Sequence, residues 1–367
     1  MTRRTSRREF LRGTPAPAAR CGARSPAVAR AAATQQAREP YLLHISRWAM
    51  ACQFEVFFNA GQYADAAQAA VEALDLVNTL EDELSFFRPT SQLSRLNLVA
   101  ADGPVEVDPR LFGLLQLALE LHRETAGAFD ITSAPLWETW GFARREGSIP
   151  SAESLAAAMK LVGSGQVKLD ARQRTVHFTK PGVRLNLGSI GKGYALDRAA
   201  EVLVSAGVGD FLFHGGQSSV LARGSRGEGD AAATGHLSPG WSVGIRDPLR
   251  PKRRLAEIRL RDRALGTSGS TMQYFRSRGR RYAHILDPRT GQPAEGVLSV
   301  TVTAPTAALA DGLSTAMFVM GPELARDYCA SRPELAALLV CPAGASGRAE
   351  IHAIGFGEDE LTLLDDD

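Results

Sequence analysis

Cysteine is scarce in this chain of 367 residues, and its few cysteines lie far apart. They form no CxxC pair and no cluster with histidine: Cys21, Cys52, Cys329 and Cys341. A structural zinc site or a disulfide framework needs several such residues at short, regular spacing. The sequence therefore indicates neither, and cysteine usage does not assign a redox compartment.

Long apolar runs and a strong charge of one sign are also missing. The longest candidate run, 297–320, contains Pro305 and Asp311, so it predicts a buried strand followed by a helix rather than a membrane span. The 42 basic residues nearly balance the 40 acidic ones. Most of the arginine excess lies in the first forty residues and the remainder is mildly acidic, so nucleic acid is not an expected partner.

The basic N-terminal segment resembles an address rather than part of a fold. Residues 6–12, SRREFLR, match the spacing of a twin-arginine export signal, although Arg20, Arg24 and Arg30 interrupt the apolar stretch that should follow. We expect residues 1–38 to be a disordered leader, with export to a periplasmic or membrane-associated location. The alternative is a basic leader without an address on a cytoplasmic protein.

Helical and extended patterns alternate irregularly along the rest of the chain. Apolar residues at helical spacing predict helices over residues 63–84, 108–125, 151–161, 194–205 and 305–320. Shorter segments predict strands, among them 41–58, 167–169, 176–179, 183–187, 211–214, 218–222, 241–245, 254–260, 264–267, 298–303, 335–340 and 351–354. This order favours an α+β (α/β mixed) fold with a mixed, largely antiparallel sheet and packed helices. We expect one folded domain over 39–356 and an acidic, disordered tail over 357–367.

The most informative stretch is 183–197, VRLNLGSIGKGYALD, where an apolar run gives way to a glycine-spaced loop and then a helix. Such a loop can direct several backbone N–H groups at one point, and the helix adds the positive end of its dipole, which predicts a phosphate site. Gly193 follows Lys192, which excludes a Walker P-loop, and GxxGxG is the reverse of the dinucleotide fingerprint. The alternative is a tight connection whose glycines only allow close packing.

Asp311 and Thr315 lie four residues apart on a predicted helix and therefore share one face. Their neighbours are apolar, so we expect this face to be buried, where an unpaired carboxylate is costly. A hard cation with oxygen ligands, such as Mg²⁺ bound also to phosphate oxygens, would remove that cost. A salt bridge to an arginine is the alternative.

Three more segments carry polar groups with two interpretations each. Asp130, in GAFDIT, could bind an adenine amino group or a ribose hydroxyl, or form a helix cap or Asx turn. The glycines of FHGGQ, 213–217, permit a ligand to approach the backbone, or only a hairpin turn. His284, in YAHILDPRTGQP, stands on an otherwise apolar strand, where a lone histidine is usually a core residue. Asp287 precedes a proline and predicts a structural turn.

Eight segments in one order resemble the FAD:protein FMN transferase (ApbE-type) family. They lie between residues 47 and 321 and read AMACQFEV, LSFFRPTSQLSRLN, TAGAFDIT with PL and WGF, LNLGSIGKGYALD, HGGQ, GTSGS, YAHILDPRTGQP and VTVTAPTAALADGLSTA. The resemblance implies a T-fold-like scaffold, with 39–356 as an FAD-binding catalytic domain. It also implies Mg²⁺-dependent transfer of FMN from FAD to a threonine or serine hydroxyl of an acceptor protein, with release of AMP. By the same analogy the acceptor is a membrane redox subunit.

The resemblance also assigns residues to the site. It implies that the metal is held by Asp311, Thr315 and the backbone carbonyl of Ser189. It implies FAD contacts at Met50, Ala128, Phe129, Asp130, Asn186, Lys192, His284 and Ile285. His284 is the candidate for handling the proton or orienting the phosphate.

The chain departs from the family pattern at three of these segments. Asn186 stands where the family often has Asp, Gly191 where it has Ala, and Gln217 where it has Glu, so each change removes charge or bulk. Asp311, Thr315 and His284 are kept, which favours an active enzyme. Two alternatives are a Mg²⁺-dependent FAD pyrophosphatase that yields FMN and AMP, and a non-catalytic FAD-binding or delivery protein.

Overall fold

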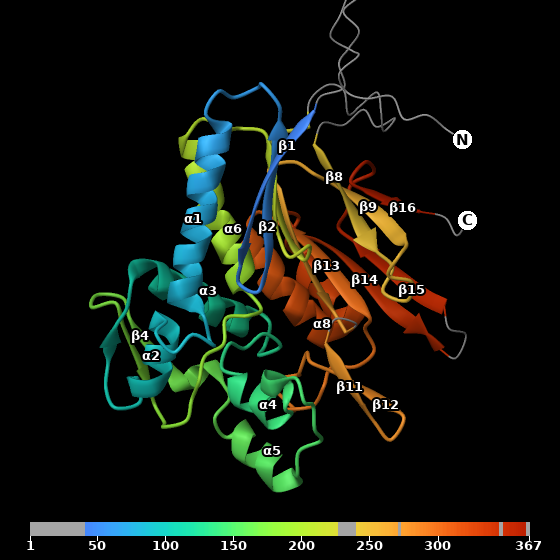
Figure 1. The fold of residues 1–367 in the computed structure, drawn as a ribbon. Helices are drawn as coiled ribbons and strands as arrows, with labels where there is room; N and C mark the ends of the chain where they lie inside the picture. The colour runs from blue at the N-terminus through green and yellow to red at the C-terminus, as the bar shows by residue number, and fades with distance from the viewer. Residues whose placement is uncertain (1–40, 227–239, 271–272, 345–347, 365–367) are drawn as a thin grey trace, which may run out of the picture. The chain divides into compact units, whose positions relative to one another are not determined.

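The fold is organised around one large antiparallel sheet, seen in a computed structural model that describes residues 41–226, 240–270, 273–344 and 348–364 (Figure 1). Its strands lie in the order β1-β2-β6-β7-β10-β13-β14-β15, and each adjacent pair is antiparallel. Their bounds are β1 Leu42–Ala49, β2 Cys52–Asn59, β6 Phe211–Gly215, β7 Ser219–Arg223, β10 Arg263–Gly269, β13 Ser299–Ala304, β14 Ala336–Ala343 and β15 Arg348–Ile354. The predicted α+β class with a largely antiparallel sheet is confirmed. The leader over 1–38 lies outside the described residues.

Three helices pack on one face of this sheet and enclose the main core: α1 (Ala66–Leu84), α6 (Gly191–Ser205) and α8 (Ala307–Ala330). In α1 the predicted helical spacing is real, because Ala70, Leu74 and Val77 are fully buried. Burying a leucine or valine side chain contributes about 1.5–3 kcal/mol. The predicted helix over 305–320 is also present, and Gly321, at φ 78°, breaks α8 just after it.

A second, three-stranded sheet of order β16-β9-β8 covers part of the other face. It comprises β8 (Trp241–Arg246), β9 (Arg254–Leu260) and β16 (Leu361–Leu363). The expectation of a disordered tail over 357–367 was therefore wrong for β16. Leu361 pairs with Ile258 of β9 and packs against the second core, so its apolar side chain gives the acidic tail a place in the fold.

The remaining elements include those next to two turns, the AFD turn of residues 128–130 and the DPRTG turn of residues 287–291. The helices are α2 Gln92–Val99, α3 Pro109–Glu124, α4 Ala134–Thr139, η2 Phe142–Arg144, α5 Ala152–Met159 and η3 Ser164–Gln166. The strands are β3 Val105–Glu106, β4 Val167–Asp170, β5 Thr175–Phe178, β11 Tyr274–Ser277 and β12 Arg280–Ala283. Asp108 and Ser151 cap α3 and α5 through their side chains, as their sequences predict. In the described ranges no helix combines the length and apolarity needed to cross a bilayer.

The predicted strand over 183–187 is not a strand. The Leu185 amide donates to the Asn97 side chain at 2.8 Å, and the Asn97 amide group donates back to the Leu185 carbonyl at 2.9 Å. The Asn186 amide donates to the Ile131 carbonyl at 2.8 Å. The Asn97 side chain and the Ile131 carbonyl therefore provide the hydrogen-bond partners that a neighbouring strand would otherwise supply to this segment.

Helices α6 and α8 are fastened to each other at unusually short range. A β-carbon on Gly193 would lie 2.1 Å from the Ala307 carbonyl oxygen, so only glycine allows this approach. One turn later, the Asp197 carboxylate accepts the amides of Ala307 and Ala308 at 2.8 and 2.9 Å and so caps α8. The two helices thereby bring the glycine loop and Asp311 together.

Candidate functional site

Asp311 is a buried carboxylate whose side chain points at the start of α6. Its Oδ2 accepts the Gly193 amide at 2.8 Å, and the Ser219 hydroxyl lies 2.8 Å from both carboxylate oxygens and donates to them. Burial raises the pKa of Asp311 to about 6, although the Lys192 charge and these hydrogen bonds pull it down. Among the described residues no arginine forms a salt bridge with Asp311, so the arginine alternative is wrong for the part of the chain that the structure describes.

A group of hydroxyls follows Asp311 on the same face of α8. Ser268 of β10 lies 2.8 Å from the Ser314 hydroxyl and 3.1 Å from the Thr315 hydroxyl. Thr315 also donates weakly to the Asp311 carbonyl at 3.4 Å, one helical turn back. The predicted shared face of Asp311 and Thr315 is thus present, and β10 adds a further oxygen beside it.

The glycine-spaced segment only partly matches its prediction. Helix α6 begins at Gly191, so Gly191 and Gly193 form its first turn rather than a loop. The Gly188 amide donates to the Asn186 side chain at 2.9 Å, and the Gly193 amide serves Asp311. The structure records no acceptor within the described residues for the amides of Ser189 and Lys192. Two backbone donors, one just before α6 and one in its first turn, therefore remain for an anion.

Four segments distant in sequence converge at this place. The ammonium group of Lys192 donates to the Ser218 hydroxyl, next to Ser219. A β-carbon on Gly312 would lie 3.7 Å from Ile190 and 3.7 Å from the Phe129 ring. The glycine segment, the β6–β7 turn, the AFD turn and α8 therefore meet around Asp311.

The β1–β2 turn joins this group through the β6–β7 turn. Met50 (φ 48°) and Ala51 (φ 58°) form the two-residue hairpin turn, and Met50 packs against the main core. The Gly216 amide donates to the Gln53 carbonyl at 2.9 Å, and a β-carbon on Gly216 would lie 2.9 Å from that of Cys52. The double glycine thus forms the predicted hairpin, and at Gly216 it also lets two turns pack closely.

The donors fit a bound magnesium ion. Mg²⁺ prefers oxygen ligands and takes few from protein when phosphates supply the others. Asp311 offers a buried carboxylate without an ion pair in the described ranges, and Thr315 adds a hydroxyl on the next turn. The described residues contain no cluster of three Asp, Glu, His or Cys side chains, so a metal here depends on one carboxylate and neutral oxygens.

Asp130 is held by the protein itself. Its Oδ1 accepts the Thr132 amide at 2.8 Å and the Thr132 and Ser164 hydroxyls, while Oδ2 lies 3.1 Å from His122 Nδ1. Burial raises the pKa of Asp130, but the hydrogen bonds from His122 and Thr132 outweigh it and keep the pKa below its usual value. Only 1 % of the side chain is exposed. The Asx-turn interpretation is confirmed, and both carboxylate oxygens accept hydrogen bonds from within the protein.

The other predicted FAD contacts are divided between core and surface. Ala128, Phe129 and Ile285 are buried, so they can offer a ligand little more than backbone atoms. Asn186 keeps its side-chain oxygen on the Gly188 amide, an Asx turn that an aspartate would also make. The AFD turn lies against the DPRTG turn, because a β-carbon on Gly127 would lie 3.6 Å from Arg289.

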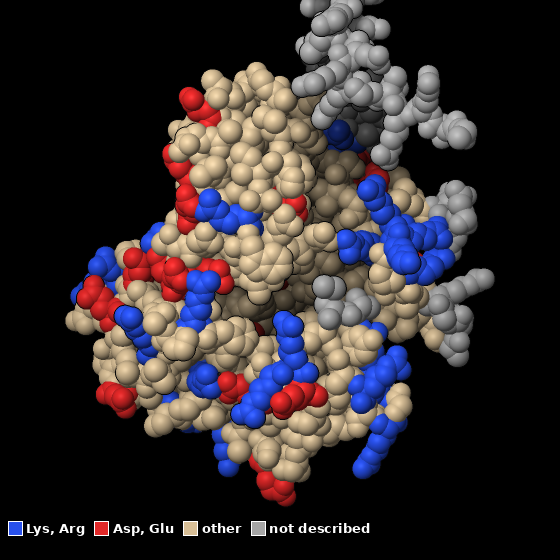
Figure 2. All heavy atoms as spheres, viewed as in Figure 1, with Lys and Arg blue, Asp and Glu red and all other residues tan. Residues whose placement is uncertain are grey.

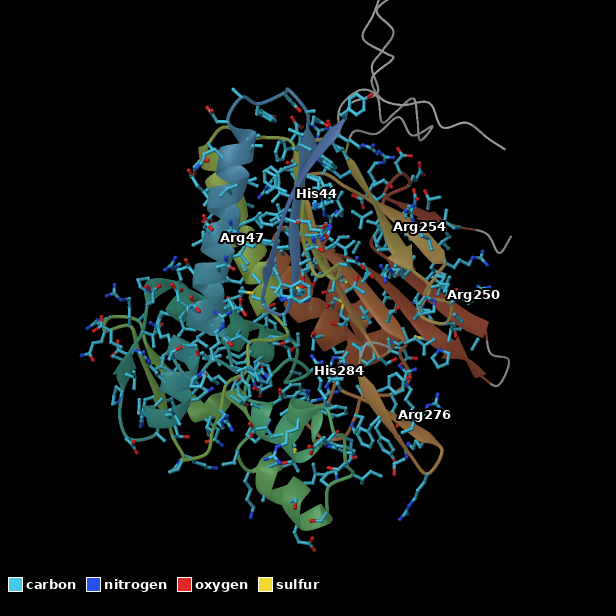
Figure 3. All side chains as sticks on the ribbon, in the orientation of Figure 1. His44, Arg47, Arg250, Arg254, Arg276 and His284 are labelled. Atoms are coloured by element: carbon cyan, nitrogen blue, oxygen red, sulfur yellow. The ribbon has the colours of Figure 1, made fainter. Side chains whose placement is uncertain are left out.

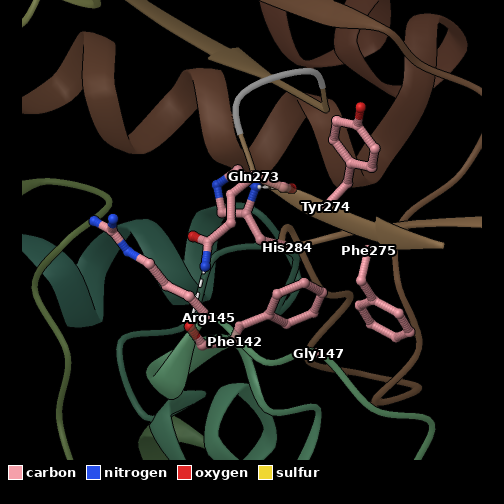
Figure 4. A pocket seen from close by; sticks show the side chains of 7 residues that line it. All are labelled: Phe142, Arg145, Gly147, Gln273, Tyr274, Phe275 and His284. Carbon is pink, nitrogen blue, oxygen red and sulfur yellow. Dashed lines mark hydrogen bonds between the residues drawn. The ribbon is translucent and has the colours of Figure 1, made fainter.

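His284 lies immediately after β12 and lines a cavity of about 460 Å³ (Figures 3 and 4). Its walls come from the turn after η2 and from β11, and include Phe142, Arg145, Tyr274 and Phe275. Burial lowers the pKa of His284, so the imidazole is neutral at pH 7. His284 is thus a cavity residue rather than the core residue that its apolar neighbours suggest.

The main chain fixes which nitrogen of His284 can accept a proton. Its Nδ1 lies 3.0 Å from the Gln273 carbonyl oxygen, which can only accept, so Nδ1 carries the hydrogen. Nε2 is then the basic atom. The Gln273 side chain in turn donates to the Phe142 carbonyl at 3.0 Å and ties both walls of the cavity together.

Three contributors to these sites are not predicted by the sequence. Ser219 was assigned only to a strand, although it is the hydroxyl that holds Asp311. Gln273 and Arg145 carry no motif, and the β11–β12 hairpin that presents Gln273 was not predicted. The one indication of this role in the sequence is the pair of serines after HGGQ, which places two hydroxyls beside the double glycine.

Solved structures define the class of protein to which this architecture belongs. It matches the ApbE protein of Thermotoga maritima with a TM-score of 0.75 and 31% identity, covering 86% of this chain and 97% of that one. It matches the flavin transferase ApbE of Vibrio cholerae with a TM-score of 0.74 and 27% identity, over 86% and 97% of the two chains. The scaffold is that of the ApbE proteins.

Sequence comparison gives the family itself. The ApbE family profile matches residues 50–339, and the chain belongs to the ApbE family. The FAD:protein FMN transferase of Haemophilus influenzae is 30% identical, over 83% of this chain and 87% of its own. That of Klebsiella pneumoniae is 33% identical, over 72% and 73%. The predicted family is confirmed, and its curated relatives are enzymes.

Proposed function

We propose that this protein transfers FMN from FAD to a threonine or serine hydroxyl of an acceptor protein and releases AMP. The carrying observation is the buried Asp311 carboxylate, which has no ion pair in the described ranges and lies at the N-terminus of α6, where two amides remain open. This arrangement suits a cation and a diphosphate together. The names of the relatives, FAD:protein FMN transferase, supply the substrate and the reaction class.

The residues around Asp311 would bind the donor. Bound Mg²⁺, held by Asp311, Thr315 and the Ser189 carbonyl, would neutralise charge on the diphosphate and polarise it. The Lys192 ammonium group and the backbone amides of Ser189 and Lys192 would donate hydrogen bonds to the same phosphate oxygens. Because Lys192 belongs to the first turn of α6 and Ser189 lies just before it, the orientation of these donors would cost little when the nucleotide binds.

His284 would act on the acceptor side. A hydroxyl hydrogen-bonded to Nε2 loses its proton to His284 as its oxygen attacks the flavin-side phosphorus. The bond from that phosphorus to the bridging oxygen breaks, and AMP leaves with the electron pair. The neutral imidazole that burial maintains is the form able to take the proton.

One assay separates this reaction from its two alternatives. The full chain is incubated with FAD, Mg²⁺ and a co-expressed candidate acceptor, such as a membrane redox subunit, and the products are analysed by in-gel flavin fluorescence and mass spectrometry. Acceptor that has gained FMN, with AMP in equal amount, supports transfer. Free FMN and AMP with an unmodified acceptor would indicate a pyrophosphatase, and bound intact FAD would indicate a delivery protein.

A further inference from the structure

The connection between β8 and β9 carries a strong positive charge. Residues 246–254, called the basic loop below, read RDPLRPKRR and contain five basic residues and a single acidic one, Asp247. The rest of the chain does not share this bias, because the residues beyond the first forty are mildly acidic overall. Figure 2 shows basic side chains gathered on the right of this view, and Figure 3 places Arg250 and Arg254 on that side. The basic loop is therefore a local charged patch.

The carboxylate of the basic loop is used to fix the shape of the loop. Asp247 is buried, and its Oδ1 accepts the amides of Leu249 and Arg250 at 2.8 and 3.2 Å. Its Oδ2 accepts Nε of Arg250 at 2.8 Å. The main chain closes the loop, because the Arg253 amide donates to the Arg250 carbonyl at 2.8 Å and the Asp247 amide donates to the Arg253 carbonyl at 3.0 Å. The exposed side chains of the loop are thus left to its basic and apolar residues.

Apolar and basic side chains are exposed together on this loop. Leu249 is 46 % exposed, and Pro251 is exposed two residues later. Lys252 is exposed and forms no ion pair within the described residues, and Arg246 and Arg254 are exposed as well. A single exposed leucine is ordinary on a protein surface. An aliphatic side chain surrounded by cations, however, is the composition of segments that enter the headgroup layer of a bilayer.

We infer that the basic loop docks this protein on the surface of an anionic lipid bilayer, with Leu249 in the headgroup layer and Lys252 against lipid phosphates. Anionic headgroups attract each nearby lysine or arginine, and the lysine stem can lie along apolar surface while its charge reaches a phosphate. A uniformly acidic protein surface would match the cations but offer nothing to Leu249, so the bilayer is favoured. The inference is independent of the proposed function, because no residue of the loop is assigned to FAD binding or FMN transfer.

The test compares how the full chain and its variants bind two kinds of vesicle. Vesicles of pure phosphatidylcholine are neutral, those with about 30 % phosphatidylglycerol are anionic, and co-sedimentation at about 0.1 M salt measures the affinity for each. The variants are Lys252→Glu, Leu249→Ser and Leu249→Trp. Arg172→Glu makes the same change of charge at an exposed position in the β4–β5 turn and is the matched control. The arginine-rich residues 1–38 can also attract anionic vesicles but are common to every variant, so the differences between variants report on the basic loop.

We expect Lys252→Glu to weaken binding to the anionic vesicles roughly tenfold and Arg172→Glu to weaken it at most about twofold. Leu249→Ser should weaken it and Leu249→Trp should strengthen it, each by roughly three- to fivefold. FAD affinity should stay the same in all four variants. An effect of Lys252→Glu no larger than that of Arg172→Glu would overturn the inference, and so would equal affinity for the two kinds of vesicle. Dependence on Lys252 without dependence on Leu249 would point to an acidic protein partner and would overturn it as well.

Discussion

The surroundings of Asp311 and of His284 differ in how completely the protein satisfies them. Around Asp311, the Gly193 amide and the Ser219 hydroxyl bind the carboxylate oxygens, and helices α6 and α8 approach each other at contact distance. Around His284, a carbonyl fixes one ring nitrogen, and the residue lines a cavity together with Arg145, which has no ion pair among the described residues. The protein itself therefore satisfies the Asp311 carboxylate, whereas the His284 cavity keeps one basic nitrogen available to a ligand.

The largest expected effect is at Asp311. Asp311→Asn keeps the shape but removes the charge that would hold a divalent ion, so we expect FMN transfer to fall about 10³-fold, the several kcal/mol that metal ions supply. Quantified AMP release at saturating FAD and Mg²⁺ measures the change. Asp327→Asn, an exposed aspartate on the same helix, is the matched control. An unchanged rate in Asp311→Asn would remove the metal assignment.

His284→Gln is expected to lower the rate of FMN transfer without changing the affinity for FAD. The glutamine can still hydrogen-bond but cannot take a proton, so transfer should fall roughly 10²–10³-fold. FAD affinity should stay within about twofold, because Asp311 and α6 are untouched. Titration of flavin fluorescence, run beside the transfer assay, checks both. A large loss of FAD affinity would show that the two regions bind one ligand jointly.

The pH profile tests the same residue in the unaltered protein. Burial lowers the pKa of His284 below its usual value of about 6.5. The neutral, proton-accepting form therefore persists at neutral pH and is lost only as the pH falls through the lowered pKa. We expect kcat/KM to be constant above about pH 7 and to decline below it with a slope of up to two, because Asp311, whose pKa burial raises to about 6, protonates over the same range as His284. A profile that already declines from pH 8 would exclude His284 as the base.

Two glycines in the first turn of α6 provide a matched pair. Gly193→Ala would place its β-carbon 2.1 Å from the Ala307 carbonyl, so we expect a loss of about 2–3 kcal/mol in the free energy of unfolding. Gly191→Ala meets its first neighbour only at 3.8 Å and should be neutral or gain up to about 1 kcal/mol. Urea unfolding followed by circular dichroism measures both. Equal losses would mean that the helices are less tightly locked than the contact distance indicates.

The smallest expected effect is at Ser219. Ser219→Ala removes the hydroxyl that orients both oxygens of Asp311, and residues in this position typically change metal affinity about tenfold. Isothermal titration with Mg²⁺ or Mn²⁺ measures it, and Ser219→Thr should restore most of the affinity. If alanine and threonine behave alike, Ser219 has no role in orienting the carboxylate.

The sequence was most informative where chemistry and periodicity coincide. Helical spacing placed Asp311 and Thr315 on one buried face, and the structure confirms that face. Asp130 stayed ambiguous because its partners His122 and Ser164 are fixed by the fold rather than by spacing. The β11–β12 hairpin was missed because its arginine-rich sequence lacks the alternation of apolar and polar residues that predicts strands.

Asp197 has a consequence for how the molecule can move. Because a residue of α6 caps the first turn of α8, neither helix can slide or rotate without breaking two amide contacts in a buried setting. The contact between α6 and the start of α8 should therefore be rigid, and amide hydrogen exchange at Ala307 and Ala308 should be slow. Any adjustment of shape on binding a partner would then fall to segments outside α6 and α8.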